Sequence, residues 1–146
     1  MPQLQIVEQL AYNPDLASDY DCLLASLHLV DEYNHVPDEI QEVCEADRSS
    51  FYLGMVGKAA VAMTTLIHPV VSLGHRTSII EDVSVHRNSR GNGYGFDMLE
   101  FVEARALELG ANRLELHSKD VRKEARGLYR KFGFEIINTD LFRKEL

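Results

Sequence analysis

The segment VSVHRNSRGNGYGFDML, from Val83 to Leu99, joins an alternating apolar strand pattern to an apolar helical pattern. Its loop carries three glycines at alternating positions, Gly91, Gly93 and Gly95. Glycine adopts positive φ readily and lets a ligand approach the backbone closely. A loop that leads into a helix also points several free N–H groups at one place, where the helix dipole adds positive potential. The segment therefore predicts an anion site, which phosphate most commonly fills.

The spacing of the glycines separates this loop from two well-known phosphate loops. A P-loop requires Gly-Lys followed by Ser or Thr, which occurs nowhere in the chain. The dinucleotide pattern GxGxxG is not met either, because Gly91, Gly93 and Gly95 are spaced two and two. Arg87 and Arg90 add positive charge, and arginine binds phosphate in a bidentate manner. The loop thus indicates a phosphate-bearing ligand, or a tight turn, rather than nucleotide hydrolysis or hydride transfer.

Periodicity along the chain predicts one domain over residues 1–146, with the element order β-α-α-β-β-β-α-β-α-β-β. Alternating apolar residues indicate strands, and apolar steps of three and four indicate helices. Gly57 and Lys58 predict a hairpin turn, Asp120 is placed to cap the last helix, and Gly133 is placed to end it. The expected strands are 3–10, 49–56, 59–69, 75–86, 112–118, 134–138 and 140–146, and the expected helices are 15–33, 36–47, 96–109 and 121–132.

The composition is that of a globular protein, and the chain of 146 residues has a net charge of −8. This acidic balance disfavours nucleic-acid binding, which needs a basic footprint, and favours a cationic substrate. The chain lacks an apolar run of about 18 residues and a secretory leader, so we expect a cytoplasmic protein without a membrane span. Cys22 and Cys44 are expected to be reduced thiols, and no residue spacing predicts a metal site.

Three motifs in order resemble those of the GCN5-related N-acetyltransferase (GNAT) superfamily. Arg90-Gly91-Asn92-Gly93-Tyr94-Gly95 resembles the family signature Arg/Gln-x-x-Gly-x-Gly/Ala. The strand IIEDVSV (79–85) is similar to the family strand that carries Glu-Asp, and ARGLYRKFGFE (125–135) is similar to its Ala-x-x-x-Tyr-x-x-x-Gly-Phe segment. Arg87 departs from the pattern, because many relatives have proline there. The resemblance extends over residues 51–146 and is only architectural in the first 50.

The resemblance implies an α/β fold with a mixed, mostly antiparallel central sheet flanked by about four helices. It also implies acetyl transfer from acetyl-CoA to an amine without a metal. In the family the loop amides bind the pyrophosphate, a strand backbone pairs with the pantetheine arm, and the thioester enters where two strands splay apart. The residues expected to bind the cofactor are Val83, Ser84, Val85, Arg90, Gly91, Asn92, Gly93, Tyr94, Gly95, Phe96, Ser118 and Arg126.

The resemblance also implies the catalytic groups. An alkylammonium must lose a proton before it can attack, and Glu81 is the expected base, acting directly or through water. Asp82 is the second candidate, although it faces the opposite side of a regular strand unless a bulge intervenes. Tyr129 is the expected acid for the departing thiolate, and a backbone N–H near Val83 is expected to stabilise the oxyanion. The alternatives are that Glu81 only attracts a cation and that Tyr129 packs at the core edge.

The acceptor remains open among small amines such as polyamines, amino sugars and aminoalkylphosphonates, with the acidic balance favouring a polycation. A catalytically silent acyl-CoA-binding or regulatory module, a protein N-acetyltransferase and a nucleotide-binding protein are the alternative functions. His68 and His75 bracket a loop that is expected to border the acceptor site. The terminal strands favour a homodimer.

Overall fold

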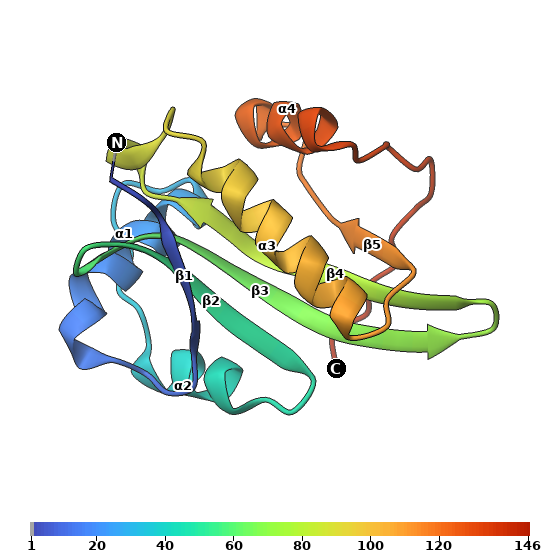
Figure 1. Cartoon of the computed structure of the whole chain (residues 1–146), viewed down its shortest axis with the longest axis horizontal. Helices are drawn as coiled ribbons and strands as arrows, with labels where there is room; N and C mark the ends of the chain where they lie inside the picture. Colours follow the sequence, from blue (N-terminus) through green and yellow to red (C-terminus); the bar gives the residue numbers. More distant parts are fainter. Residues whose placement is uncertain (1) are drawn as a thin grey trace.

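A five-stranded sheet with helices on both faces organises residues 2–146, which the computed structural model describes (Figure 1). The strands lie in the order β1-β2-β3-β4-β5, with three antiparallel pairings and one parallel pairing, between β4 and β5. This confirms the predicted mixed, mostly antiparallel sheet with four flanking helices. The strands are β1 (Gln5–Gln9), β2 (Ser49–Val56), β3 (Ala59–Ser72), β4 (His75–Val85) and β5 (Arg113–Leu116), and the helices are α1 (Ala17–His28), α2 (Pro37–Glu45), α3 (Tyr94–Glu108) and α4 (Lys123–Phe132), with 3-10 turns at Pro14–Leu16 and Arg87–Ser89.

Two apolar cores hold the helices against the sheet. On one face α3 inserts Leu99 and Val102, both fully buried, against Leu66 of β3 and neighbouring strand residues. On the other face α1 and α2 contribute Leu23 and Ile40, which pack against the inward side chains of β2 and β3. In Figure 1 α3 crosses in front of the sheet, and α1 and α2 lie behind it. The sheet therefore separates two layers, and β4 is in contact with both.

The two strands predicted over 134–138 and 140–146 are wrong, because the structure forms neither. After Gly133 the chain continues as an irregular, largely exposed segment that runs past β5 (Figure 1). The Thr139 N–H donates to the carbonyl of Ile137 at 3.0 Å, which turns the chain tightly within the segment. Alternating side chains do not make a strand without a ladder partner. The predicted order is therefore confirmed only as far as α4.

Two helix ends also differ from prediction. Leu29 adopts a left-handed conformation with φ 57°, and this ends α1 at His28 rather than at residue 33. Asp120 does not cap α4, because its carboxylate accepts a hydrogen bond from Arg126 at 2.9 Å and Arg122 occupies the N-cap. Gly133, with φ 114°, ends α4 as predicted. None of the helices over residues 2–146 is long and apolar enough to cross a membrane.

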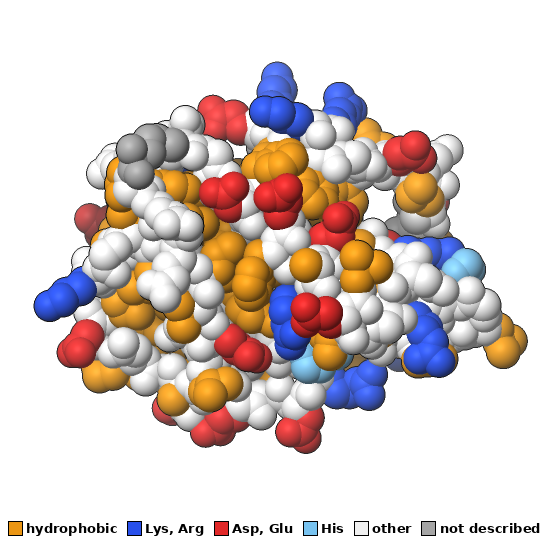
Figure 2. All heavy atoms as spheres, in the orientation of Figure 1, with side chains coloured by type: hydrophobic (Ala, Val, Ile, Leu, Met, Phe, Trp, Pro, Cys, Tyr) orange, Lys and Arg blue, Asp and Glu red, His pale blue; other side chains and the backbone are white. Residues whose placement is uncertain are grey.

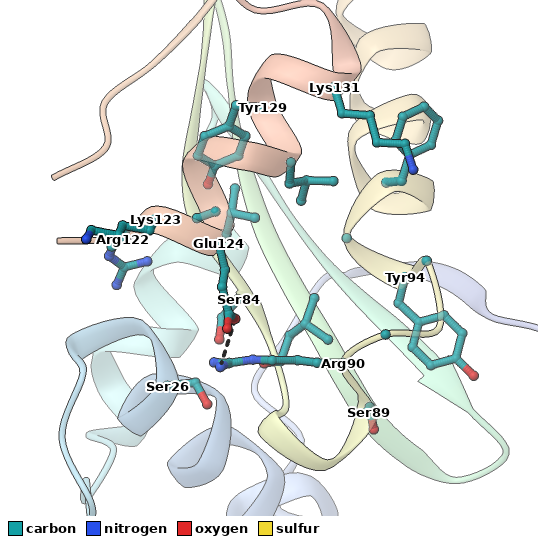
Figure 3. Close-up of a pocket in the computed structure, with 18 of the residues that line it drawn as sticks. Ser26, Ser84, Ser89, Arg90, Tyr94, Arg122, Lys123, Glu124, Tyr129 and Lys131 are labelled. Carbon is teal, nitrogen blue, oxygen red and sulfur yellow. Dashed lines mark hydrogen bonds and ion pairs between the residues drawn. The ribbon is translucent and has the colours of Figure 1, made fainter. Parts of the chain in front are cut away.

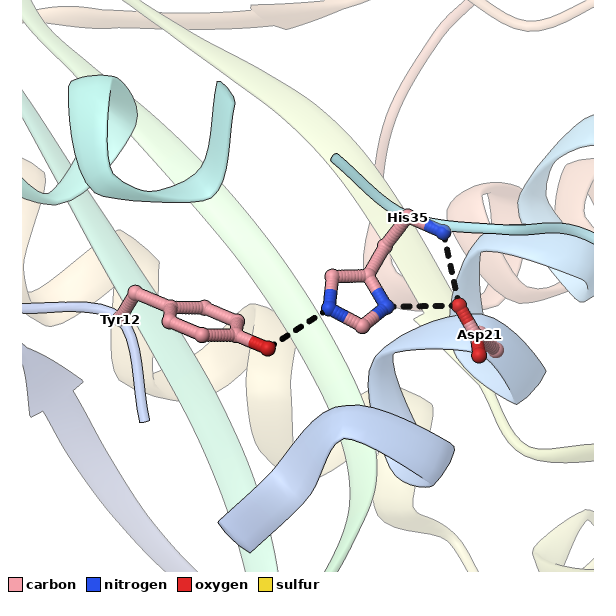
Figure 4. A network of polar contacts seen from close by, with 3 residues as sticks. All are labelled: Tyr12, Asp21 and His35. Atoms are coloured by element: carbon pink, nitrogen blue, oxygen red, sulfur yellow. Dashed lines mark hydrogen bonds and ion pairs between the residues drawn. The ribbon is translucent and has the colours of Figure 1, made fainter. Parts of the chain in front are cut away.

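A polar network anchors the segment between α1 and α2 (Figure 4). The His35 imidazole lies between the Asp21 carboxylate, 2.7 Å from Nδ1, and the Tyr12 hydroxyl, 2.8 Å from Nε2. The His35 backbone N–H donates to the same carboxylate at 2.7 Å. Burial opposes ionisation of Asp21, but the hydrogen bonds from His35 and its positive charge when protonated lower the pKa of this carboxyl below its usual value.

We expect Asp21→Asn to lower the free energy of unfolding at pH 7, because the variant loses the hydrogen bonds between His35 and a charged carboxylate. The loss should be only about 1 kcal/mol, because the carboxylate is partly exposed and water weakens these bonds. A depressed pKa stabilises the fold above the ordinary Asp value, and this stabilisation is lost as the pH falls through the folded value. The difference in free energy of unfolding between wild type and variant should therefore be smaller at pH 3 than at pH 7. Urea unfolding at both pH values tests this, with exposed Asp31→Asn as control. An equal difference at both pH values would contradict the network's role.

Candidate active site

The glycine loop, β4 and α4 enclose a groove of about 580 Å³ (Figure 3). Val83 and Val85 of β4 line one side, and Leu128 and Tyr129 of α4 line the other. Nine of the twelve residues predicted to bind the cofactor line it: Val83, Ser84, Val85, Arg90, Gly91, Gly93, Tyr94, Gly95 and Phe96. The start of α3 lies beside α4, so the glycine loop and the segment that carries Tyr129 line the same groove.

Gly91 and Gly93 leave the groove open to a ligand. They have φ values of +81° and +83°, and a Cβ built on either would meet no atom within 4 Å. Gly93 is also the N-cap residue of α3, and no side chain caps this helix. The first N–H groups of a helix have no partner within it, so they are available to an anion at this end of the groove.

Gly95 has a different role from the other two glycines. A Cβ at this position would lie 2.8 Å from Cδ2 of Leu128, too close for real contact. Gly95 therefore permits the start of α3 to pack directly against α4. Close packing between two helices therefore explains why a glycine occupies this position.

The groove is basic although the whole chain is acidic. Arg90, Arg122, Lys123 and Lys131 line it, together with one carboxylate, Glu124. Figure 3 shows the ion pair between Arg90 and Glu124, which are 3.7 Å apart. Basic side chains also project over α4 in the space-filling view (Figure 2). This concentration of positive charge suits a ligand with several phosphates.

Ser26 of α1 lines the same groove, although it is not among the predicted cofactor-binding residues. Its hydroxyl is buried and has no hydrogen-bond partner among the described residues. A buried hydroxyl is normally satisfied, so a ligand in the groove is the natural partner. The available signal was a serine one turn after Leu23 on the buried side of α1. Nothing in the sequence shows that this part of α1 faces β4.

Three predicted cofactor residues lie outside the groove. Asn92 closes the loop on itself by donating to the carbonyl of Ser89 at 2.9 Å. Ser118 and Arg126 line a separate cavity of about 380 Å³ between β5, α4 and the C-terminal segment. Tyr129 borders both this cavity and the groove.

A bulge in β4 decides where the two acidic candidates point. Met63 pairs with Ser84 and Thr65 pairs with Glu81, so β4 uses one residue more than β3 in this interval. Asp82 within it has a positive φ of 57°, rare for a residue with a side chain. Its carboxylate accepts a hydrogen bond from the Thr65 hydroxyl at 2.8 Å. A bulge is therefore present at Asp82, and it places the Asp82 carboxylate on the same face of the sheet as the Thr65 side chain.

Asp82 lines a second cavity, of about 300 Å³, between α1, α2 and the sheet. Its neighbour Val83 lines the first groove. Successive Cα atoms are about 3.8 Å apart, so the two cavities approach each other at the bulge. The pairing of β4 with β5 ends at Ile80 and Leu116, just before this point. Glu81 lines neither cavity, and it is only partly buried.

The environment shifts the pKa values of two predicted catalytic groups upward. Partial burial raises the pKa of Glu81, the neighbouring Asp82 raises it further, and His117 acts in the opposite direction. Burial raises the pKa of Tyr129, with Arg122 opposing, so this phenol is protonated at neutral pH. Among residues 2–146 no hydrogen bond occupies the Tyr129 hydroxyl, and Figure 3 shows its oxygen pointing into the groove.

His68 and His75 lie away from both cavities. The Nε2 atom of His68 is 2.8 Å from the Ser50 hydroxyl, and His75 contacts Arg113 at 2.9 Å. The β3–β4 hairpin that connects them extends beyond the end of the sheet (Figure 1). The loop expected to border the acceptor site therefore borders neither cavity.

The model of the acetyltransferase (GNAT) family matches residues 15–134, most of the chain. The chain belongs to the GNAT acetyltransferase family. This confirms the resemblance drawn from the three motifs and identifies the protein as an N-acetyltransferase by family. The match begins in the first helices, in the region where the motifs gave only an architectural likeness.

Solved structures share the fold of this GNAT protein at low identity, and no curated protein matches its sequence. An aminoglycoside acetyltransferase from an uncultured soil metagenomic sample is 16% identical, with a TM-score of 0.79 over 98% of this chain and 96% of that one. A ribosomal-protein-alanine N-acetyltransferase from Brucella melitensis is 17% identical, with a TM-score of 0.76 over 97% and 99%. AAC(6′)-Iy with the bisubstrate analogue CoA-S-monomethyl-acetylneamine is 14% identical, with a TM-score of 0.77 over 99% of both chains.

We expect Gly93→Val to raise the Kd for acetyl-CoA at least about tenfold, because the side chain would fill the open approach to the backbone. Gly74→Val is the matched control, since Gly74 has φ +85°, equally open space and a place in the β3–β4 turn. Both substitutions strain the backbone alike, and thermal unfolding checks this. Calorimetric binding that is equal for the two variants would contradict a role of the loop in ligand binding.

Proposed function

We propose that this GNAT protein transfers the acetyl group of acetyl-CoA to the primary amine of a small molecule by direct attack. The observation that supports this most is the bulge of β4, where the basic groove and a carboxylate-bearing cavity approach each other. The groove suits the acyl donor, and the cavity suits the amine. The names of the solved relatives, which include an aminoglycoside and a ribosomal-protein-alanine acetyltransferase, support an amine as acceptor.

The residues of the groove fit coenzyme A. Bound there, acetyl-CoA supplies the acetyl group as an activated thioester. The free amides at the start of α3 and the side chains of Arg90 and Lys123 would hold the phosphates, and the backbone of 83–85 would hold the pantetheine arm. The unpartnered Ser26 hydroxyl provides a further hydrogen-bonding group for the arm. The bulged Val83 N–H would stabilise the negative charge that develops on the carbonyl oxygen.

The two acidic residues, Asp82 and Glu81, have different roles toward the amine. Asp82 lines the acceptor cavity and binds the incoming ammonium. Glu81 lies beside it, and its raised pKa moves it toward the range in which a base is effective near neutral pH. Because Glu81 does not line the cavity, we assign the proton transfer from amine to Glu81 to a water relay. The neutral amine then attacks the thioester.

As the C–N bond forms and the C–S bond breaks, Tyr129 donates a proton to the thiolate that leaves. The nitrogen gives up its second proton when the amide forms, and this proton restores the Tyr129 phenol. This phenol is buried against the groove and stays protonated at neutral pH. Direct attack needs no covalent enzyme intermediate and therefore no cysteine, and neither Cys22, which is exposed, nor Cys44 lines the groove.

We expect Glu81→Gln to lower kcat/KM about 10²-fold at pH 7. The loss should diminish as the pH rises toward the pKa of the amine, because the amine then loses its proton unaided. A raised folded pKa removes stability from the wild type as the pH rises through it, so the melting temperature of the variant minus that of the wild type should be larger at pH 7 than at pH 4. A pH–rate profile for Glu81→Gln that runs parallel to wild type at all pH values would exclude Glu81 as the base; exposed Glu115→Gln is the control.

We expect Tyr129→Phe to lower kcat about 10²-fold while the Kd for acetyl-CoA stays unchanged. The hydroxyl makes no hydrogen bond within residues 2–146, so its removal should leave the melting temperature unchanged. Release of free CoA with a panel of amines measures the effect. If wild type binds acetyl-CoA and acetylates no amine, the protein is a silent acyl-CoA-binding module. An unchanged kcat in the variant would exclude Tyr129 as the acid.

A further inference from the structure

The acceptor cavity carries information about the amine, and this inference rests on the proposed acetyl transfer. We infer that the acceptor is a compact primary amine with one ammonium group on an apolar body. The cavity of about 300 Å³ corresponds to the volume of roughly ten water molecules. That space holds an alkylamine or arylalkylamine of about ten non-hydrogen atoms, whereas an amino sugar of two or three rings exceeds it.

The walls of the cavity are mainly apolar. Leu24 and Leu27 come from α1, Ile40 comes from α2, and Phe51 and Met63 come from the sheet. Ile40, Phe51 and Met63 are buried, so they form the floor rather than the rim. An apolar substrate body gains the free energy of leaving water on this surface, about 25 cal/mol for each Å² that it buries.

A partly buried carboxylate, that of Asp82, lines the cavity beside the bulge. Asp82 accepts a hydrogen bond from Thr65, which is itself buried, and within residues 2–146 no Lys, Arg or His side chain pairs with it. A single ammonium would neutralise this charge. A second ammonium on the same molecule would lie among apolar side chains, which is costly unless it reaches the exposed Glu39 or His28 at the rim.

The walls are held in place by contacts that need no substrate. Tyr20 lines the cavity, and its ring lies 5.6 Å from the imidazole of His35, the centre of the network in Figure 4. Tyr33 lines it as well and stacks on His28 with ring centroids 4.8 Å apart. A preformed apolar cavity selects by shape and by the number of charges, because it cannot easily rearrange around a longer or more polar amine.

Pentylamine and cadaverine provide a matched test, because they differ only by a second terminal amine. With acetyl-CoA saturating, we expect kcat/KM for pentylamine and for 2-phenylethylamine to exceed that for cadaverine at least tenfold. Equal or higher kcat/KM for cadaverine, spermidine or kanamycin would overturn the inference but leave the acetyl transfer intact. If none of these amines is acetylated although acetyl-CoA binds, the proposed function itself fails.

A substitution in the wall tests the cavity directly. We expect Leu24→Gln to lower kcat/KM for 2-phenylethylamine about tenfold, mainly through KM, and to leave the Kd for acetyl-CoA unchanged. Leu107→Gln is the control, since this leucine is 64% exposed on α3, on the other face of the sheet. Equal kcat/KM for 2-phenylethylamine in the two variants would mean that the amine binds elsewhere, and the inference would fail. Circular dichroism and thermal unfolding establish that both variants are folded.

Discussion

The extra residue in β4 between Glu81 and Ser84 is the constraint on which the site depends. In a regular strand, successive side chains face opposite sides of the sheet, and every backbone N–H has a place in the ladder. The bulge breaks both rules at once. It directs Asp82 toward α1 and α2 while Val83 faces the groove beside α4, and the register gives neither residue a partner on β3. The bulge places Asp82 in the left-handed backbone conformation, and strained residues of this kind are concentrated at functional sites.

The net charge of the whole chain is negative, whereas the side chains that line the groove are mainly positive. The chain as a whole is acidic, but the groove gathers four basic side chains around the start of α3. Charges farther away than the Debye length of about 8 Å are largely screened in physiological salt, so the charges that line the groove, and not the total charge, govern binding of a phosphate-bearing ligand. The same reasoning applies to the acceptor cavity, where a single carboxylate in apolar surroundings counts for more than the distant acidic surface.

Features that are set by neighbouring residues could be predicted from the sequence. Features that are set by contacts between distant segments could not. The glycine loop, the hairpin turn at Gly57 and the end of α4 at Gly133 are specified by neighbouring residues, and the structure confirms the elements that they bound. Ser26, by contrast, reaches the groove only because α1 packs on β4, a contact between distant segments. The bulge depends on the register between β3 and β4, which composition does not encode. The C-terminal segment shows the opposite error: its alternation predicts two strands, but no strand among residues 2–146 pairs with it.

The apolar cavity also changes how the acidic balance of the chain bears on its substrate. Net charge favoured a polycation, because an acidic protein attracts positive ligands over long distances. Attraction of this kind speeds encounter, but specificity is set where the ligand is desolvated. In the cavity a first ammonium meets Asp82, and a second one meets Leu24, Leu27 and Phe51. The desolvation of the second charge has no compensating partner among those side chains, so the acceptor that we propose is a monoamine, although the acidic surface attracts a polycation more strongly.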